Sequence, residues 1–142
     1  MSSPYLRDYI AFASEQLWPN LIGFCNAREY FDGIGNVILL HTSDPKRSAG
    51  PARRIKECLE INRRMFPEMA QVCLVETGST PQEVAETLHS LTNDPQRSFV
   101  INATGGTKLI FAGAISLCSL PNVEVHYLEV TQQWFRLRLG SD

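Results

Sequence analysis

Short apolar runs alternate along most of the chain with longer segments whose apolar residues recur at helical spacing. The short runs predict four buried strands, over residues 9–13, 37–40, 71–75 and 98–101. The segments between them predict helices that begin near Pro19, Gly50 and Thr80, and a fourth, almost wholly apolar helix over 109–120. We expect the helix after Gly50 to extend far enough for Met65 to share its buried face.

The pattern changes near the C-terminus, where two strand-like segments, 123–130 and 134–139, follow each other closely. The connection between them is too short for a parallel crossover, so the two segments are expected to form an antiparallel hairpin. Phe135 and Leu137 alternate with Trp134 and Arg136, as in a half-solvated edge strand. The sequence therefore predicts an α/β fold, doubly wound, with a mainly parallel sheet of about six strands and an antiparallel hairpin at the edge. Residues 1–142 are expected to form a single ligand-binding domain.

The charge of the chain is nearly balanced, with a formal net charge of −2. This balance argues against a long nucleic acid as partner, which would require basic residues over a broad face. Residues 46–64 depart from it, because seven basic residues there face only two acidic ones. Such a local excess suits a compact anion, although a solvated helix face explains it equally well.

The four cysteines, Cys25, Cys58, Cys73 and Cys118, are widely separated and have apolar neighbours. We expect them to be buried free thiols in a reducing compartment, and we expect no metal site. The sequence shows no signal peptide, and its longest apolar stretch is too short to span a bilayer. It therefore predicts a cytoplasmic protein without a membrane partner.

The segment 102–108 follows an apolar strand and precedes the apolar helix, which places a glycine pair and a lysine at a helix start. Helix N-termini offer unpaired N–H groups and partial positive charge to an anion, and glycine permits positive φ angles and close approach of a ligand. Neither a Walker A loop nor a dinucleotide fingerprint is present. The segment is thus a candidate phosphate site, and the alternative is a tight turn with an exposed lysine. Its candidate ligand-binding residues are Asn102, Thr104, Gly105, Gly106, Thr107 and Lys108.

Two further polar clusters follow predicted strands, and the carboxyl ends of parallel strands meet at one edge of a sheet. For Ser14 and Thr42, capping of the next helix is as reasonable as ligand contact, and His41 equally fits a satisfied histidine at a strand end. Asn102 has a similar alternative role, which is to brace the glycine turn. The additional candidate ligand-binding residues are Ser14, Glu15 and Gln16 in the first cluster and His41, Thr42 and Ser43 in the second.

The segments 13–16, 39–42 and 102–109, in this order along the chain, resemble the CARF domain, the CRISPR-associated Rossmann fold. The resemblance covers almost the whole chain, and Asn-x-Thr-Gly-Gly-Thr-Lys is its most specific element. It implies a sensor of type III CRISPR antiviral defence that binds a cyclic oligoadenylate, most often cyclic tetra-adenylate, across the axis of a homodimer. CARF proteins usually join the sensor to an effector, so an effector domain or partner absent from this chain is expected.

A ring nuclease is the enzymatic alternative, in which a ribose 2′-hydroxyl attacks the neighbouring phosphate and opens the ring. This chemistry requires no metal or other cofactor, because the nucleophile belongs to the substrate. Its candidate catalytic residues are Lys108 for charge stabilisation, Ser14 and Thr42 for orientation, and His41 as acid or base. A flavodoxin-like protein that binds a mononucleotide or phosphate is the alternative from a different class.

Overall fold

The computed structural model describes residues 7–105, 107–129 and 131–138, and its central feature is one six-stranded sheet. The strand order is β3-β2-β1-β4-β5-β6, in which only the β5–β6 pair is antiparallel. The predicted fold class and the predicted hairpin are therefore confirmed. This order also differs from the 2-1-3-4-5 order of flavodoxin-like proteins. The strands are β1 (Arg7–Phe12), β2 (Ile34–His41), β3 (Val72–Glu76), β4 (Phe99–Asn102), β5 (Val123–Leu128) and β6 (Trp134–Leu137).

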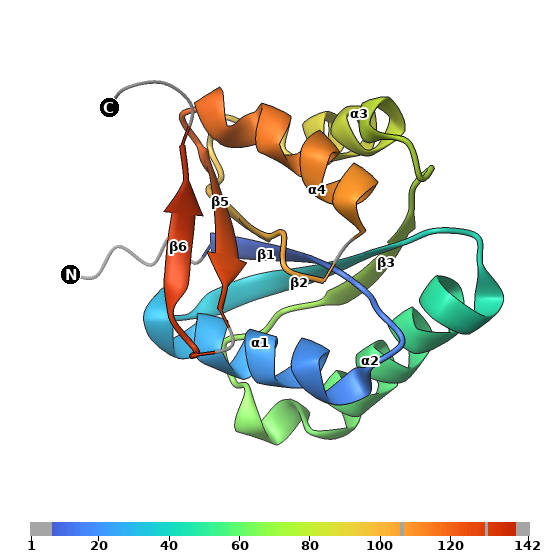
Figure 1. Cartoon of the computed structure of the whole chain (residues 1–142). Helices are drawn as coiled ribbons and strands as arrows, with labels where there is room; N and C mark the ends of the chain where they lie inside the picture. The colour runs from blue at the N-terminus through green and yellow to red at the C-terminus, as the bar shows by residue number, and fades with distance from the viewer. Residues whose placement is uncertain (1–6, 106, 130, 139–142) are drawn as a thin grey trace.

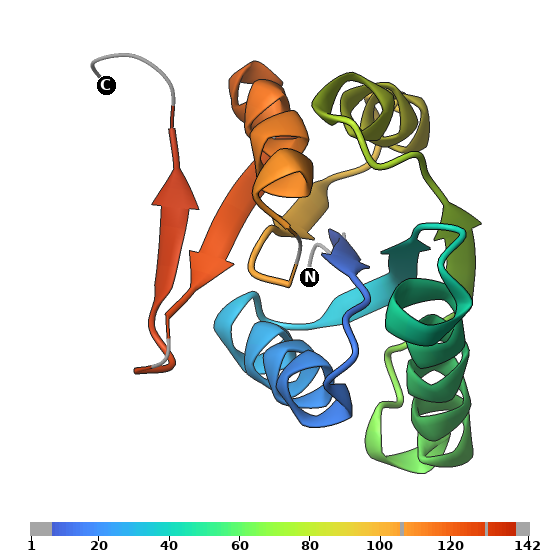
Figure 2. The same cartoon turned by 45° about the vertical axis from the view of Figure 1, so that its right-hand side comes forward.

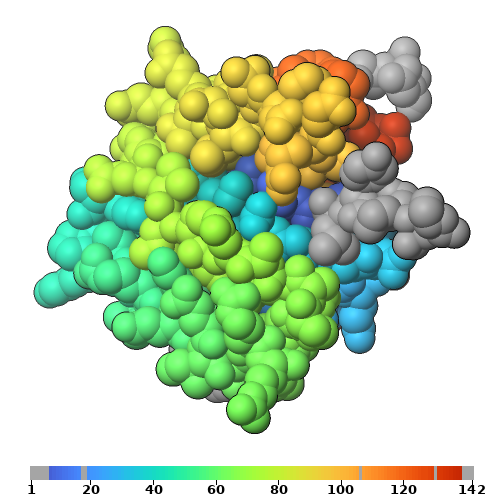
Figure 3. Space-filling model, turned by 180° about the vertical axis from the view of Figure 1, so that it is seen from behind, coloured from blue at the N-terminus to red at the C-terminus, as the bar shows by residue number. Residues whose placement is uncertain are grey.

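Helices cover both faces of the sheet (Figures 1 and 2). On one face lie α1 (Leu17–Tyr30) and α2 (Gly50–Ile61), and on the other lie α3 (Pro81–Leu91) and α4 (Lys108–Ile115). Short turns extend three of the connections: Pro45–Ala49 before α2, Arg63–Met65 after it and Ser116–Ser119 after α4. Figure 3 shows the molecule from behind, with the green segment that follows α2 below the yellow segment of α3.

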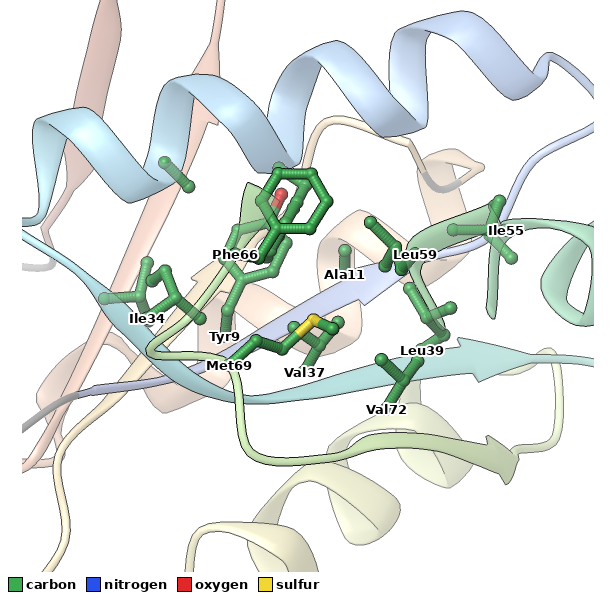
Figure 4. Close-up of a cluster of buried hydrophobic side chains, with 14 of the residues drawn as sticks. Tyr9, Ala11, Ile34, Val37, Leu39, Ile55, Leu59, Phe66, Met69 and Val72 are labelled. Carbon is green, nitrogen blue, oxygen red and sulfur yellow. The ribbon is translucent and has the colours of Figure 1, made fainter. Parts of the chain in front are cut away.

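Strand alternation divides the core into two layers, one on each face of the sheet. Tyr9 and Ala11 of β1 point into the layer under α1 and α2, whereas Ile10 and Phe12 point into the layer under α3 and α4. Figure 4 shows the first layer, where side chains of β1, β2 and β3 meet those of α2 and of the segment that follows it. Because residues 9–12 of β1 are buried on both faces of the sheet, they read as a continuous apolar run in the sequence.

The helix after Gly50 is shorter than expected, because it ends at Ile61. Met65 lies in the turn beyond it and is 67% exposed, so its predicted place on the buried face is wrong. Two local features account for this end. The Asn62 side chain donates to the Cys58 carbonyl, and Phe66 precedes a proline, which disfavours helical backbone.

The apolar helix predicted over 109–120 is also divided, into α4 and the turn Ser116–Ser119. The Ser116 hydroxyl donates to the Gly113 carbonyl 2.7 Å away and competes for the acceptor that a continuing helix would use. The cysteines are free, as expected, but none is buried: Cys25 is exposed and the other three are partly exposed. Within the described residues, no helix is long and apolar enough to cross a membrane, and no three potential ligands from His, Cys, Asp and Glu gather as a metal site.

A buried carboxylate joins the amino ends of the three central strands. Asp8 of β1 is 4% exposed and accepts three hydrogen bonds from Arg97, at 2.6, 2.7 and 2.9 Å. Its Oδ1 also accepts the backbone N–H of Asn36 in β2, 3.2 Å away. These hydrogen bonds hold the start of β1 against β2 and against the residues before β4. Loss of one partner would leave an unpaired buried charge, so separation of these strands is costly.

An aromatic cluster attaches the hairpin to the end of α1. The His126 ring lies 4.8 Å from the ring of Phe31 and 6.1 Å from that of Trp134, between ring centroids. Trp134 is therefore buried, whereas its neighbour Phe135 lies on the other face of the hairpin and is 47% exposed. The His126 Nε2 atom is 2.9 Å from Oε1 of Glu124.

Burial lowers the pKa of His126 and outweighs the hydrogen bond and charge of Glu124, which raise it. The unfolded chain therefore binds more protons below the ordinary imidazole pKa of about 6.5, and stability falls as the pH decreases through that value. We predict that the melting temperature falls between about pH 7.5 and about pH 5.5, and that His126→Gln has a flatter profile. Thermal unfolding monitored by circular dichroism measures this, with His89→Gln on the exposed face of α3 as the control. Equal slopes for the wild type and His126→Gln would contradict the assignment.

Candidate functional site

The candidate site lies at the carboxyl edge of the sheet, where β1 and β4 run side by side. Chain order reverses between these two strands, since β1 continues through α1 to β2 on one side and β4 continues to β5 on the other. Crevices at such a switch point are the usual ligand sites of open α/β sheets. The loops after β1, β2 and β4 meet there, as the sequence predicts, and β3 lies at the outer edge.

Hydrogen bonds to two other strands fix the loop that leaves β4. Asn102 is 7% exposed, donates through Nδ2 to the Tyr9 hydroxyl at 2.8 Å, and accepts the Thr104 N–H through Oδ1 at 3.0 Å. The Thr104 hydroxyl accepts the Leu128 N–H at the end of β5, 2.8 Å away. Burial raises the pKa of Tyr9, which keeps the phenol neutral. Asn102 therefore braces the loop, which is the structural alternative that the sequence left open.

Gly105 follows in this loop and lies against the end of β1. A Cβ atom at this position would be 2.6 Å from the carbonyl oxygen of Phe12, so no other residue fits without displacing the backbone. The φ angle of Gly105 is outside the left-handed region. Glycine is required here because the backbone of β1 lies so close. The expected approach of a ligand to Gly105 stays a prediction. Gly106, the second predicted glycine, lies outside the described residues.

The start of α4 presents a charged side chain beside a helix N-terminus. The Thr107 hydroxyl accepts the Ile110 N–H at 3.3 Å and caps the helix, and no acidic residue lies in the first turn. Lys108 is exposed and has no ion pair with the part of the chain that the structure describes. Since Thr107 caps only one N–H group, the other N–H groups of the first turn and the Lys108 side chain can interact with an anion.

The loop after β1 is fixed by Asn20, a residue that the sequence analysis did not select. Its Nδ2 donates to the Ser14 hydroxyl at 2.9 Å and to the Gln16 carbonyl at 2.7 Å. Ser14 thus has a local partner. It does not cap α1, since the N-cap residue is Gln16, whose side chain makes no capping hydrogen bond. Glu15 is exposed and lies 3.6 Å from Arg47, a surface pair of small energetic weight.

The loop after β2 is held mainly by hydrogen bonds between its own side chains and its own backbone. His41 places Nδ1 2.9 Å from the Thr42 carbonyl oxygen, and the Thr42 N–H donates to the buried Ser48 hydroxyl at 2.7 Å. Asp44 caps the following turn by accepting two backbone N–H groups. His41 therefore has the local partner expected of a strand-end histidine, and Ser43 is exposed between these contacts.

Two hollows on either side of the β4–α4 loop bring part of the predicted set together. A cavity of about 50 Å³ joins Ser14 with Asn102, Thr104 and Gly105 beside Asn20. A second, open hollow of about 240 Å³ joins Thr104 with Thr107 and Lys108. The predicted residues that line neither hollow are Glu15, Gln16, His41, Thr42 and Ser43.

Aromatic residues of the second hollow were missed by the sequence analysis. Phe111 and Tyr127 form its far wall, with their ring centroids 6.2 Å apart at a right-angled arrangement. Tyr127 is 39% exposed. The strand period offered a signal, because it puts Tyr127 on the same face as Val123 and Val125, which pack in the layer under α3 and α4.

Residues 9–140 match the family model described as the Card1 CARF domain. The match spans nearly the whole chain, from Tyr9 within β1 through the candidate site and past β6. The chain therefore belongs to the CARF family. Comparison with curated protein sequences finds no match.

The solved structures that share the fold include the following two. One is Can2 from Sulfobacillus thermosulfidooxidans in complex with cyclic tetra-adenylate, with a TM-score of 0.63 and 17% identity over 94% of this chain. The other is a type III CRISPR defence DNA nuclease activated by cyclic oligoadenylate, with a TM-score of 0.68 and 18% identity over 99% of this chain. The chain spans 38% and 21%, respectively, of the lengths of these two proteins.

The Thr104 hydroxyl provides a direct test of the loop brace. We predict that Thr104→Val destabilises the protein by about 1–3 kcal/mol, because valine keeps the shape but leaves the Leu128 N–H without its acceptor. Urea unfolding at equilibrium measures the change. Thr104→Ser retains the hydroxyl and is expected to keep most of the stability. A valine variant as stable as the wild type would show that this hydrogen bond contributes nothing to folding.

Proposed function

We propose that this CARF domain, over residues 1–142, binds a cyclic oligoadenylate, with cyclic tetra-adenylate as the preferred ring, and acts as a sensor in type III CRISPR defence. The observation that carries the proposal is the match of residues 9–140 to the Card1 CARF domain. The two structural neighbours, one bound to cyclic tetra-adenylate and one activated by cyclic oligoadenylate, support the same ligand class.

The chemistry of the site supports a phosphate-containing ligand. Lys108 supplies a full positive charge at the N-terminus of α4, where partial charge of the same sign adds to it. The braced loop from Asn102 to Gly105 presents its backbone at the switch point of the sheet. A phosphate beside Lys108 would leave the adjoining base near Phe111 and Tyr127, which offer aromatic surface for stacking.

A homodimer is the second part of the proposal, because a ring with several phosphates suits a two-fold site that presents each contact twice. One side of α4 packs closely on α3, where a Cβ atom at Gly113 would lie 2.6 Å from the Pro81 carbonyl oxygen. Leu109, one turn before Gly113 on α4, is 54% exposed. Tyr127, which contacts Phe111 of α4, and Phe135, opposite it on β6, are further exposed apolar side chains on the α4 face of the hairpin.

A charge on this surface is expected to break the dimer. We predict that the wild type has a solution mass twice that of the 15.9 kDa chain, and that Leu109→Glu is a monomer. Light scattering after gel filtration measures both masses. Ile61→Glu is the control, since Ile61 is 82% exposed at the end of α2, away from this surface. A wild-type monomer at high concentration, or a dimer that tolerates Leu109→Glu, would exclude α4 as the dimer contact.

Ring binding tests the proposed ligand. We predict that cyclic tetra-adenylate binds at least about a hundredfold more tightly than AMP, and that Lys108→Ala weakens ring binding at least about tenfold through loss of a charge-assisted contact. Isothermal titration calorimetry measures both affinities. Arg64→Ala removes an equally exposed charge beyond the far end of α2 and is expected to leave binding unchanged. A preference for AMP over the ring would return the mononucleotide alternative, and an unaltered Lys108→Ala affinity would remove the lysine from the site.

Mass spectrometry of the ring after incubation with excess protein and EDTA separates the sensor from the ring nuclease. An intact ring retained by the protein agrees with a sensor. Linear di-adenylate that ends in a 2′,3′-cyclic phosphate would identify a metal-independent ring nuclease, with Lys108, Ser14, Thr42 and His41 as the residues to replace next. The local hydrogen bonds of Ser14 and His41 favour the sensor, because both side chains already have partners in their own loops.

A further inference from the structure

A second concave surface lies on the α1 face of the β5–β6 hairpin and belongs to no part of the site described above. This hairpin groove has a volume of about 500 Å³ and is open to solvent. Its floor and walls come from Arg7 of β1, from Tyr30 and Phe31 at the end of α1, and from Glu124, His126 and Arg136 of the hairpin. The volume is within the range of small-molecule sites.

Positive charge exceeds negative charge in the groove, because three arginines face two carboxylates. Glu124 is the central acid: its Oε2 lies 3.3 Å from Nη1 of Arg7 and 3.9 Å from Nη1 of Arg136. Burial raises the pKa of Glu124. The hydrogen bond with His126 and the charges of the two guanidiniums outweigh this effect and lower the pKa below its ordinary value, so the carboxylate stays charged. Arg138 and Asp32 complete the rim.

Among the residues that the structure describes, one carboxylate shared by two guanidiniums leaves most of their N–H donors unused. The side chains of Arg7 and Arg136 are 36% and 37% exposed, whereas that of Glu124 beneath them is 27% exposed. A phosphate or carboxylate on the solvent side can therefore bridge both arginines without displacing Glu124. Bridging of this kind uses the fork geometry of the guanidinium group.

Aromatic surface lines the same groove. Tyr30 is 58% exposed, although its ring contacts Phe31 at a centroid distance of 4.8 Å. The guanidinium carbon of Arg7 lies 5.7 Å from the centre of the Phe31 ring, so a cation and two aromatic rings stand together. Flat aromatic ligands stack on such groups, and the adjacent arginines supply the contacts for a charged substituent.

We propose that the hairpin groove is a second binding site, which takes a small aromatic anion of the nucleoside monophosphate class. The anionic group bridges Arg7 and Arg136, and the planar base lies against Tyr30. The groove opens beside the first residues of β1 and β5, while the β4–α4 loop with Lys108 lies beyond the last residues of β1 and β4. The proposal is therefore independent of the cyclic oligoadenylate site.

Calorimetric titration with AMP, adenosine and inorganic phosphate as separate probes tests the groove. AMP is expected to bind more tightly than either fragment, and Arg136→Ala and Tyr30→Ala are each expected to weaken AMP binding at least about tenfold. Arg53→Ala, an exposed arginine on α2, is the matched control and keeps the wild-type affinity. Thermal unfolding of each variant confirms that it is folded at the titration temperature.

Lys108→Ala distinguishes this groove from the oligoadenylate site. AMP binding that survives Lys108→Ala but is lost in Arg136→Ala agrees with the second site, whatever the result with the cyclic ring. AMP binding that is lost in Lys108→Ala and kept in Arg136→Ala would place the nucleotide at α4 and overturn the proposal. Absence of AMP binding, or binding no tighter than that of phosphate alone, would overturn it as well.

Discussion

The candidate site depends on a short chain of buried hydrogen bonds that crosses three strands. Tyr9 of β1 accepts from Asn102, Asn102 accepts from the Thr104 backbone, and the Thr104 hydroxyl accepts from Leu128 of β5. Each of these groups would lose solvation on burial without its partner, so the chain forms as a unit or leaves costly unpaired atoms. Through it, the loop before α4 takes its position from the sheet and not from the helix that follows.

Local sequence patterns predict the layers, the parallel strands, the hairpin and the edge where the loops gather, because apolar runs and short connections restrict the topology strongly. These patterns fail where contacts between residues far apart in the sequence determine the local structure. The close packing of Gly105 on the Phe12 carbonyl oxygen, which leaves no room for a Cβ atom, and the hydrogen bonds that Asn20 donates depend on packing between loops. Trp134, read as part of an edge, is buried by the end of α1. The division of α4 from its following turn depends on one serine hydroxyl, which helical periodicity does not record.

The candidate site residues fall into two groups. Asn102, Ser14 and His41 have partners inside the protein and shape the loops, whereas Lys108 is exposed beside a helix N-terminus and points the site toward anions. Sequence alone treats these residues alike, since each is a polar residue after a strand. The structure distinguishes them by where their hydrogen bonds go, and this distinction supports the proposal that Lys108 and backbone amides contact a phosphate.

The central strands are fixed at both ends, by the Asp8–Arg97 ion pair at their start and by the Tyr9–Asn102 hydrogen bond at their finish. A loop attached to such fixed strands has little conformational freedom, so it loses little conformational entropy when a ligand binds. Ordering of the backbone otherwise costs roughly 1–2 kcal/mol for each residue. For the residues from Asn102 to Gly105 this entropy has already been lost during folding, so contacts made there contribute more fully to affinity.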